Sequence, residues 1–565
     1  MKRSKQEGRQ SRKCSNRRAV TPDARKPRKV GCLVALTSAV LVLAGGVDVA
    51  RGQCHANELL MLTASDAKEG DYFGCSASIS GDLAVIGAFG NDDAGSEAGA
   101  AYVYRFDGTT WIEVTKLTAS DPGDGDGFGS SVTIGGDVIV VGVAKDDNSR
   151  GSAYVFQRDH GGPDNWGEVK KLTASDGAAD DRFGTSLSIS GDMVVIGADG
   201  NDDAGSQSGS AYIFERNHGG QNNWGQVKKL TASDAAAVDR FGYAVSLSAD
   251  VAVIGAFADD DGAPNAGSAY IFQRNYGGPD NWGEVTKLNA SDPGGDDWFG
   301  AAVSISKDVA LVGAFRDDEG AGDSGSAYIF ERNHGGPDNW GQVAKFSNPA
   351  PAADDHFGEA VAICGDVAGI GVQQDDDVGR NAGSAYLYWF DGTTWIEAAK
   401  LTASDGETLD FFGRNISISG DTALLGVLSN DDHGSQSGSA YIFRGLSDCN
   451  CNDVLDVCDI VEGTSEDANG NGVPDECESG CNGKVKIKKA KCNTKSAKVE
   501  KVIVVAKKAT PRRDCTATLD TGQHLTRKVK SNGKVKFRFK GNNVPPCGPN
   551  GVMVCGKHKG FDCEC

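Results

Sequence analysis

Residues 58–66 read ELLMLTASD, and the last part of this stretch, LTASD, returns at four later places in the chain. These places are residues 117–121, 172–176, 230–234 and 401–405, and a variant, LNASD, occupies residues 288–292. At these five later places a segment that begins with tryptophan comes first, as in WIEVTKLTASD. The first copy has no tryptophan and no repeat before it. The repeats therefore begin with the final part of a unit, and the fold has to account for that.

The repeating unit is marked by the dipeptide Phe-Gly, which occurs seven times at intervals of 55 or 58 residues. Each unit reads roughly FGxxVSIS, GDVAVIGA, an acidic loop, GSAYIF, a second loop and W..V.KLTASD. The alternating first segment is typical of a half-buried strand, and the apolar run VAVIGA is typical of a strand covered on both faces. The pattern predicts four short antiparallel strands per unit, with the recurrent tryptophan packed at the start of the fourth. The seven phenylalanines are Phe73, Phe128, Phe183, Phe241, Phe299, Phe357 and Phe412.

The seventh unit ends at GSAYIF, residues 438–443, and lacks a fourth strand. Residues 57–64 would supply that strand from the other end of the chain. Seven four-stranded blades then close into a ring with no exposed sheet edge. An open solenoid is the alternative, but it needs polar terminal caps that are not evident here. The sequence therefore predicts an all-β fold, in which residues 53–446 form a seven-bladed β-propeller closed by the N-terminal strand.

These units resemble FG-GAP repeats, the units of the β-propeller in integrin alpha chains. The Phe-Gly step, the alternating strand, the VVIGA-type strand and the G-x-A-Y-I-F strand match in the same order over residues 57–443. The resemblance implies a propeller that serves in binding or cell adhesion. Many blades of that family carry a D-x-D-x-D-G calcium loop between the first two strands. Here this connection is SGD or a variant, too short to wrap a cation, so those calcium ligands do not carry over.

Residues 1–52 have the features of an export signal. The first 29 residues hold 12 Lys and Arg against two acidic residues, and residues 31–46 form an uncharged apolar run. This order predicts a signal peptide, cleaved after Gly46 or Gly52, and hence an extracellular or cell-surface protein. An uncleaved membrane anchor is the alternative, because the run nearly reaches the roughly 17–25 residues of a membrane span. Membrane attachment is expected only in that second case.

Acidic residues gather in two connections of each unit, from the second strand to the third and from the fourth strand to the next unit. Both connections lie on one face of a ring of four-stranded meanders, so that face is predicted to carry carboxylates blade by blade. Such a face attracts cations or a basic partner. The alternative is that these residues form turns and keep an exported protein soluble. The pairs include Asp92-Asp93, Asp146-Asp147, Asp202-Asp203, Asp317-Asp318 and Asp431-Asp432.

Residues 447–479 hold two copies of a calcium-loop pattern. DANGNGVPDECE, residues 467–478, has oxygen ligands at the EF-hand loop positions and Gly472 at the sharp turn. The earlier copy, residues 448–459, has Asp453 in place of that glycine, so weaker binding is expected. The pair resembles thrombospondin type 3 or dockerin-like calcium loops, and a hydrophilic linker is the alternative. The predicted calcium ligands are Asp467, Asn469, Asn471, the Val473 carbonyl, Asp475 and Glu478, and Asp448, Asn450, Asn452, the Val454 carbonyl, Asp456 and Asp459.

Residues 480–565 hold 21 Lys and Arg against five acidic residues. Basic and apolar residues alternate in stretches such as residues 533–541, which predicts a small β-domain with one cationic face. The Asn-Gly step in SNGK, residues 531–534, predicts a hairpin turn. Eleven of the 16 cysteines lie between Cys449 and Cys565, which predicts disulfides in an exported chain. The cationic face is expected to bind a polyanionic surface; docking on the acidic propeller face and plain solvation are the alternatives.

No enzyme signature is evident, since the sequence lacks P-loop, G-x-S-x-G and HExxH motifs. The sequence predicts a non-catalytic binding or adhesion protein, a monomer, whose ligand is an extracellular protein or polysaccharide. Calcium is the expected cofactor, and export argues against a nucleic-acid partner. A structural component of an envelope or matrix, and a polysaccharide-active lyase or hydrolase, are the alternatives.

Overall fold

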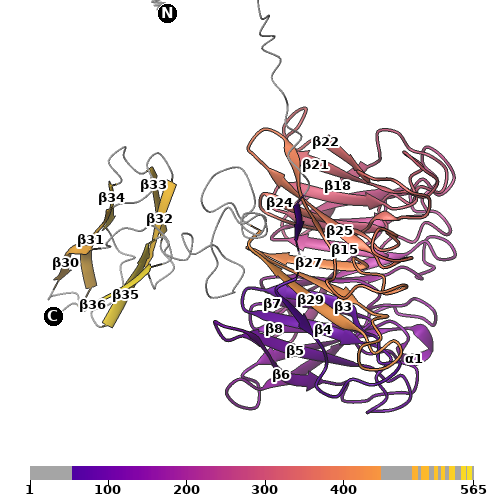
Figure 1. The fold of residues 1–565 in the computed structure, drawn as a ribbon, viewed down its shortest axis with the longest axis horizontal. Coiled ribbons are helices and arrows are strands. Elements are labelled where there is room, and N and C mark those ends of the chain that lie inside the picture. The colour runs from indigo at the N-terminus through magenta and orange to yellow at the C-terminus, as the bar shows by residue number, and fades with distance from the viewer. Residues whose placement is uncertain are drawn as a thin grey trace, which may run out of the picture. The chain divides into compact units, whose positions relative to one another are not determined.

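The computed structural model describes residues 54–56 and 58–446, together with seven strands between Lys486 and Asp562. The repeats form seven β-sheets, each with four antiparallel strands (Figure 1). The first strands of successive sheets contact one another in order, and β27 (Asn415–Ser419) contacts β3 (Phe73–Ser80). This last contact closes the ring, so the predicted all-β, seven-bladed propeller is confirmed.

Within each blade, strands that follow one another in the chain are neighbours in the sheet. Blades one to three are β3, β4 (Leu83–Ala88), β5 (Ala100–Phe106) and β6 (Trp111–Leu117); β7 (Ser131–Gly135), β8 (Val138–Val143), β9 (Ser152–Arg158) and β10 (Trp166–Leu172); and β11 (Leu187–Ser190), β12 (Met193–Ala198), β13 (Ser210–Glu215) and β14 (Gly225–Leu230). Blades four to six are β15 (Ala244–Ser248), β16 (Val251–Ala256), β17 (Ser268–Arg274) and β18 (Trp282–Leu288); β19 (Ala302–Ser306), β20 (Val309–Ala314), β21 (Ser326–Arg332) and β22 (Trp340–Ser347); and β23 (Phe357–Cys364), β24 (Val367–Val372), β25 (Ser384–Phe390) and β26 (Trp395–Leu401).

Blade seven is built from both ends of the repeat region. It contains β27, β28 (Thr422–Val427) and β29 (Ser439–Arg444), and β2 (Leu60–Leu62) pairs antiparallel with β29 as its fourth strand. The register places Met61 opposite Tyr441. The predicted closing strand is therefore confirmed. A further strand, β1 (Cys54–Ala56), pairs parallel with β26 and gives blade six a fifth strand that the sequence pattern did not predict.

The Phe-Gly step holds each blade against its neighbour. The seven phenylalanines are at most 1% exposed, and each packs against a tyrosine of the same blade, as Phe73 does against Tyr102 with ring centroids 5.4 Å apart. The following glycine, Gly74, has a φ of +90°, and a Cβ on it would lie 2.1 Å from the Ser439 oxygen of blade seven. No other residue fits such a close approach between backbones. The close packing of neighbouring blades explains why both residues recur.

Apolar side chains fill the space between neighbouring sheets. Val85 of blade one and Val141 of blade two belong to the same buried cluster. Five of the six recurrent tryptophans are buried and Trp395 is half-buried, in agreement with their expected packing role. Blade-to-blade burial of this kind is repeated around the ring.

The remaining described elements are few. α1 (Asp146–Ser149) is a single turn in a loop of blade two. Within the described residues, no helix has the length and apolar character needed to cross a bilayer. The predicted calcium loops and the leader lie outside the described residues. Cys75 and Cys364 are free thiols.

The C-terminal strands form two sheets. One sheet has the order β30 (Lys486–Asn493), β31 (Lys498–Lys507) and β34 (Lys534–Lys540). The other has the order β33 (His524–Lys528), β32 (Asp514–Leu519), β35 (Pro549–Val554) and β36 (Lys557–Asp562). β33 and β34 flank the Asn-Gly step but pair with β32 and β31, not with each other. The predicted hairpin at residues 531–534 is therefore wrong, because β33 pairs with the strand that precedes it and β34 pairs with β31 of the other sheet.

Candidate functional site on the loop face

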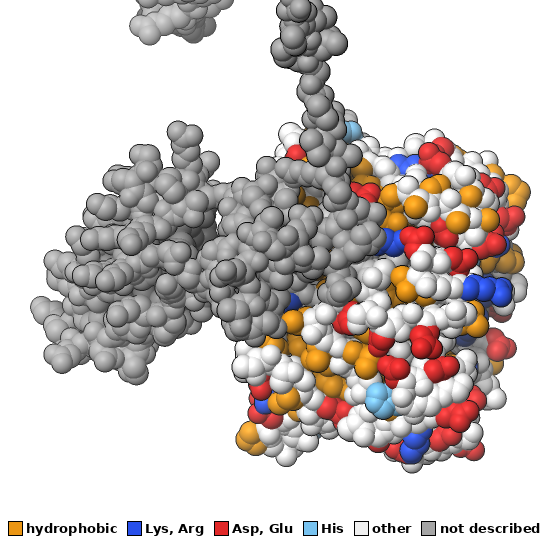
Figure 2. Space-filling view, in the orientation of Figure 1, with side chains coloured by type: hydrophobic (Ala, Val, Ile, Leu, Met, Phe, Trp, Pro, Cys, Tyr) orange, Lys and Arg blue, Asp and Glu red, His pale blue; other side chains and the backbone are white. Residues whose placement is uncertain are grey.

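The loop face is the side of the propeller that carries the connections between second and third strands and between successive units. Figure 2 shows many acidic side chains on the visible side of the propeller, with lysine and arginine among them. One aspartate in each connection between units closes a turn by accepting a backbone N–H, as Asp239 does from Ala236 over 2.6 Å. Asp239 is 5% exposed, and its burial raises its pKa to about 6. Such aspartates act as turn residues, as one of the two interpretations of the acidic loops expects.

In six blades, a lysine of the fourth strand lies among the loop-face aspartates. Lys116 of blade one has its Nζ atom 2.9 Å from Asp66 Oδ2 and 2.6 Å from Asp93 Oδ2. The same Nζ lies 5.3 Å from the centre of the Tyr102 ring, which is opposite in the strand register. The equivalents, each over the tyrosine of its own blade and beside at least two carboxylates, are Lys171, Lys229, Lys287, Lys345 and Lys400.

In four of these blades the contacts raise the pKa of the lysine. Burial lowers the pKa of Lys287, but hydrogen bonds to Asp234, Asp261 and Asp259 outweigh the burial and raise the pKa overall. Hydrogen bonds from lysine likewise lower the pKa of Asp93 in blade one. Each lysine supplies the positive charge that its group of carboxylates requires. In these six blades the geometry favours an internal ion pair rather than an open cation site.

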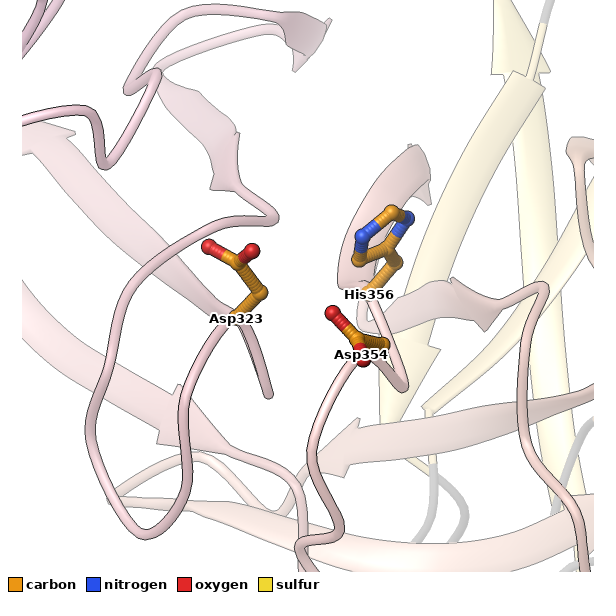
Figure 3. A group of neighbouring side chains, drawn as sticks. All are labelled: Asp323, Asp354 and His356. Carbon is orange, nitrogen blue, oxygen red and sulfur yellow. The ribbon is translucent and has the colours of Figure 1, made fainter.

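Blade five brings together three groups that could hold a metal ion. Asp323 stands on one loop and Asp354 and His356 on the next, bordering the same space (Figure 3), with ligand atoms within 4.8 Å of one another. Other side chains already engage two of them: Arg316 Nη2 lies 3.2 Å from Asp323 Oδ2, and Glu359 Oε2 lies 3.3 Å from His356 Nδ1. The Arg316 guanidinium therefore already contacts this cluster. Among the described His, Cys, Asp and Glu residues, no other set of three has its ligand atoms this close together.

A row of partly exposed aromatic rings borders the channel opening on the loop face. Ring centroids lie 4.6 Å apart for Tyr243 and Phe257, 5.0 Å for Phe257 and Trp298, and 5.4 Å for Trp298 and Phe315. His356 continues the row 4.9 Å from Phe315. We call these five residues the aromatic arc. Tyr243 is 43% exposed, and none of the five is fully buried.

Behind the arc, the first strands enclose a hollow of about 410 Å³ in the channel. Tyr243 and Phe315 line it, and Thr185, Glu359 and Arg414 add polar groups from other blades. A concave site with aromatic walls and a few converging polar groups is typical of ligand-binding pockets. The arc and this hollow form the candidate functional site.

Charged groups continue the site beyond Tyr243. Arg182 Nη2 lies 2.7 Å from Asp199 Oδ2, and Arg240 Nη1 lies 3.6 Å from the same oxygen. Asp199 is 3% exposed, and its Oδ1 atom has no hydrogen-bond partner. Burial raises the pKa of Asp199, although Arg182 opposes that shift. Two guanidinium groups share one carboxylate, which leaves hydrogen-bond donors available beside the aromatic rings.

The sequence interpretation missed the arc. Its members occupy the positions that flank Phe-Gly or follow Gly-Ala, and the residue type there changes from blade to blade. Residues that are the same in every repeat serve the fold. A position whose residue type differs between otherwise similar repeats is therefore the signal that would have identified the members of the arc. The predicted calcium ligands of residues 448–459 and 467–478 lie outside the described residues, so the structure places none of them.

Comparisons with known proteins identify the repeat. A family model for the FG-GAP repeat matches residues 57–104, 111–156, 166–214, 224–272, 282–330, 340–388 and 395–443. No curated protein matches the chain. One similar solved structure is the crystal structure of Sqt1 from Chaetomium thermophilum, with a TM-score of 0.40 and 12% identity, over 69% of this chain and 90% of that chain. The family matches end at residue 443, so they give no support to a thrombospondin or dockerin resemblance further on. The seven matches coincide with the seven blades and cover more than half of the sequence, and the chain belongs to the FG-GAP repeat family.

Proposed function

We propose that this chain is an exported, non-catalytic binding protein whose propeller holds an extracellular polysaccharide on the loop face. The observation that supports it best is the aromatic arc beside the channel hollow. The apolar faces of sugar rings stack on partly exposed aromatic rings, and neighbouring guanidinium and carboxylate groups bond to sugar hydroxyls. An extracellular protein is the second candidate ligand, because aromatic and arginine side chains are also enriched at protein interfaces.

The test compares two exposed tyrosines on opposite faces of the ring. Tyr243 of the arc is 43% exposed, and Tyr276, in the connection between β17 and β18, is 47% exposed. Tyr243→Ala should weaken binding on a glycan array about two- to tenfold, since aromatic stacking contributes about 0.5–1.5 kcal/mol. Tyr276→Ala should bind like the unchanged chain. Equal binding by both variants would contradict a site at the arc.

Calcium and the basic tail enter the proposal through their sequence patterns. Calcium bound by residues 447–479 would order a segment with few apolar residues, and the basic tail would attach the protein to a polyanionic surface. Asp467→Ala should lower calcium stoichiometry by about one equivalent in calorimetry. Retention of the full chain on heparin that is lost at moderate salt would support the tail's role, and flow-through at low salt would contradict it.

A catalytic channel is the competing function that the polar groups Glu359 and Arg414 require us to test. Incubation with acidic polysaccharides that the array identifies should produce no shorter fragments over time. Turnover that disappears in Glu359→Gln would overturn the non-catalytic proposal, while binding alone would remain attributable to the arc.

A further inference from the structure

Blade seven lacks the lysine that neutralises the loop-face aspartates in the other six blades. Met61 of β2 takes its place, opposite Tyr441, as Lys116 lies opposite Tyr102 in blade one. A methionine side chain ends one heavy atom before the position of a lysine ammonium group. The position that an ammonium group fills in six blades therefore has no positive charge from β2 in blade seven.

The other members of the cluster keep the arrangement seen in blade one. Tyr441 donates its hydroxyl to Asp405 Oδ1 over 2.9 Å, and Asn430 Nδ2 lies 3.3 Å from that hydroxyl. The backbone N–H of Asp432 donates to Asn430 Oδ1 over 3.2 Å. The same three contacts in blade one measure 2.7, 3.4 and 3.2 Å. In blade one, this set of residues surrounds a cation, the Lys116 ammonium group.

The charge around the cluster is also more negative in blade seven. Glu407 stands where blade one has Lys68, whose Nζ atom lies 2.5 Å from Asp93. Within residues 58–446, neither Asp405 nor Asp432 has a lysine, arginine or histidine partner at ion-pair distance. The equivalent aspartates of blade one, Asp66 and Asp93, share the Lys116 ammonium group, whereas Asp405 and Asp432 have no such cation among the described residues.

A buried hydroxyl also lies in the cluster. Ser439 is fully buried, its Oγ atom has no hydrogen-bond partner, and it lies beside the Tyr441 phenol. The equivalent Ser384 of blade six donates its hydroxyl to Asp375, which also bonds to the lysine there. Ser152 and Ser326 likewise lack a partner in blades that have lysine, so the serine alone does not distinguish blade seven. The missing lysine does distinguish it, and the Ser439 hydroxyl is a further oxygen beside the Tyr441 phenol.

We propose that Asp405 and Asp432 bind a calcium ion at the position where the other blades hold a lysine ammonium group. The donors available are all oxygens, from carboxylate, amide, phenol and hydroxyl groups, and hard divalent cations prefer such donors. Oxygen donors from two separate loops suit the irregular coordination of calcium better than the strict octahedron of magnesium. Both carboxylates are exposed, so affinity in the range of about 10⁻⁴–10⁻³ M is expected, as in extracellular calcium modules.

This site differs in position from the loops that bind calcium in related propellers. Those loops connect the first and second strands, whereas this cluster joins the connection after β26, the connection after β28 and the closing strand β2. A bound ion would link both ends of the repeat region at the ring closure. The inference does not depend on the proposed polysaccharide function, because it concerns a different group of residues.

The experiment measures calcium binding to the full chain by calorimetry. Met61→Lys places an ammonium group in the cluster and should lower the stoichiometry by one calcium equivalent. Met61→Leu, the matched apolar control, should keep it. The double variant Lys116→Met and Lys68→Glu recreates the cluster in blade one, because it removes both cations beside Asp93, and should add one equivalent.

Each outcome decides the proposal. Equal stoichiometry in Met61→Lys and Met61→Leu would overturn it, as would equal binding of magnesium and calcium at the Met61-dependent site. If Met61→Lys fails to fold by circular dichroism, the double variant Asp405→Asn and Asp432→Asn replaces it. Loss of one equivalent in that variant supports the site, and retention overturns it. Calcium bound by residues 447–479 contributes equally to all variants and cancels in the comparison.

Discussion

Blade one and blade seven share a four-stranded sheet and the same tyrosine, asparagine and aspartate cluster, yet they differ in continuity and charge. Blade one is one uninterrupted segment and holds Lys116 and Lys68 among its aspartates. Blade seven takes its fourth strand from residues about 350 positions away and holds Met61 in place of lysine. The fold therefore repeats its four-stranded sheet in every blade, but it does not repeat the charges of the cluster in every blade. The exception lies where the ring closes.

The closing strand bonds to both of its neighbours. The backbone N–H of Leu59 donates to Ile442 within blade seven, and the carboxylate of Glu58 accepts from the backbone N–H of Ser404 in blade six. Glu113 of blade one accepts from Ser65 in the same way. Blade seven thus has the same links between blades as the continuous part of the ring. The difference between blade one and blade seven is one of connectivity and charge, not of these hydrogen bonds between blades.

The largest effect is expected from removal of the closing strand. Deletion of residues 53–64 removes β2 and Leu62, which is 4% exposed, and leaves β29 as an open edge. The free energy of unfolding should fall by about 5 kcal/mol or more, since a sheet edge and an apolar core become exposed. Thermal denaturation measures the loss. Deletion of residues 53–57 alone, which removes β1, is the control and should cost much less. Equal melting temperatures for the full chain and the longer deletion would contradict closure by β2.

A smaller effect is expected from a methyl group at the closing contact. In Gly74→Ala the new Cβ would lie 2.1 Å from the Ser439 oxygen, at a φ of +90°. The loss should be about 3 kcal/mol, because two backbones must separate. Gly81→Ala has a φ of +61° with no atom within 4 Å, so it should lose only about 1 kcal/mol. Chemical denaturation measures the free energy of unfolding of both variants, and the difference between their losses reports the contact between blades. Equal losses would show that this contact adds nothing to the cost of backbone strain.

The smallest effect concerns the blades that keep their lysine. Burial raises the pKa of Asp239 to about 6 in the folded protein, above its ordinary value of 3.8. Its protonation therefore favours folding: the contribution is complete below about pH 4 and is lost as the pH rises through 6. Asp239→Asn stays neutral and should stabilise the protein at pH 8 by about 1 kcal/mol or less, allowing for solvent screening. Urea denaturation near pH 4 should show no difference. A gain of equal size at both pH values would contradict the raised pKa.

The sequence was sufficient for the scaffold because each repeated residue has a local reason. Phe73 fills the space beside its tyrosine, Gly74 permits close approach of the neighbouring blade, and both recur at fixed intervals. Counting these steps and the LTASD stretches was enough to predict seven blades and a closing strand. The Asn-Gly turn prediction at residues 531–534 was wrong, because a local preference does not determine which strands pair over long distances.

The candidate site could not be predicted in the same way. Tyr243, Trp298 and His356 lie in different blades and occupy positions that vary between repeats, so no pattern along the chain connects them. Only the ring brings their side chains to one edge of the channel. The ion pairs could not be predicted from the sequence either, since Lys116 and Asp66 are 50 residues apart. The sequence predicted an acidic face, and the register of the strands decided that lysine neutralises it.

By itself, the sequence determined that the chain forms a sevenfold ring and that ELLMLTASD belongs to its last blade, because repeat counting and strand patterning depend on local residue types. The tertiary structure alone decided which aspartates have a cation and which do not. Met61 is an ordinary apolar residue until strand pairing places it opposite Tyr441, where every other blade has lysine. Charge compensation depends on distances between residues far apart in the chain, and only the closed fold sets those distances.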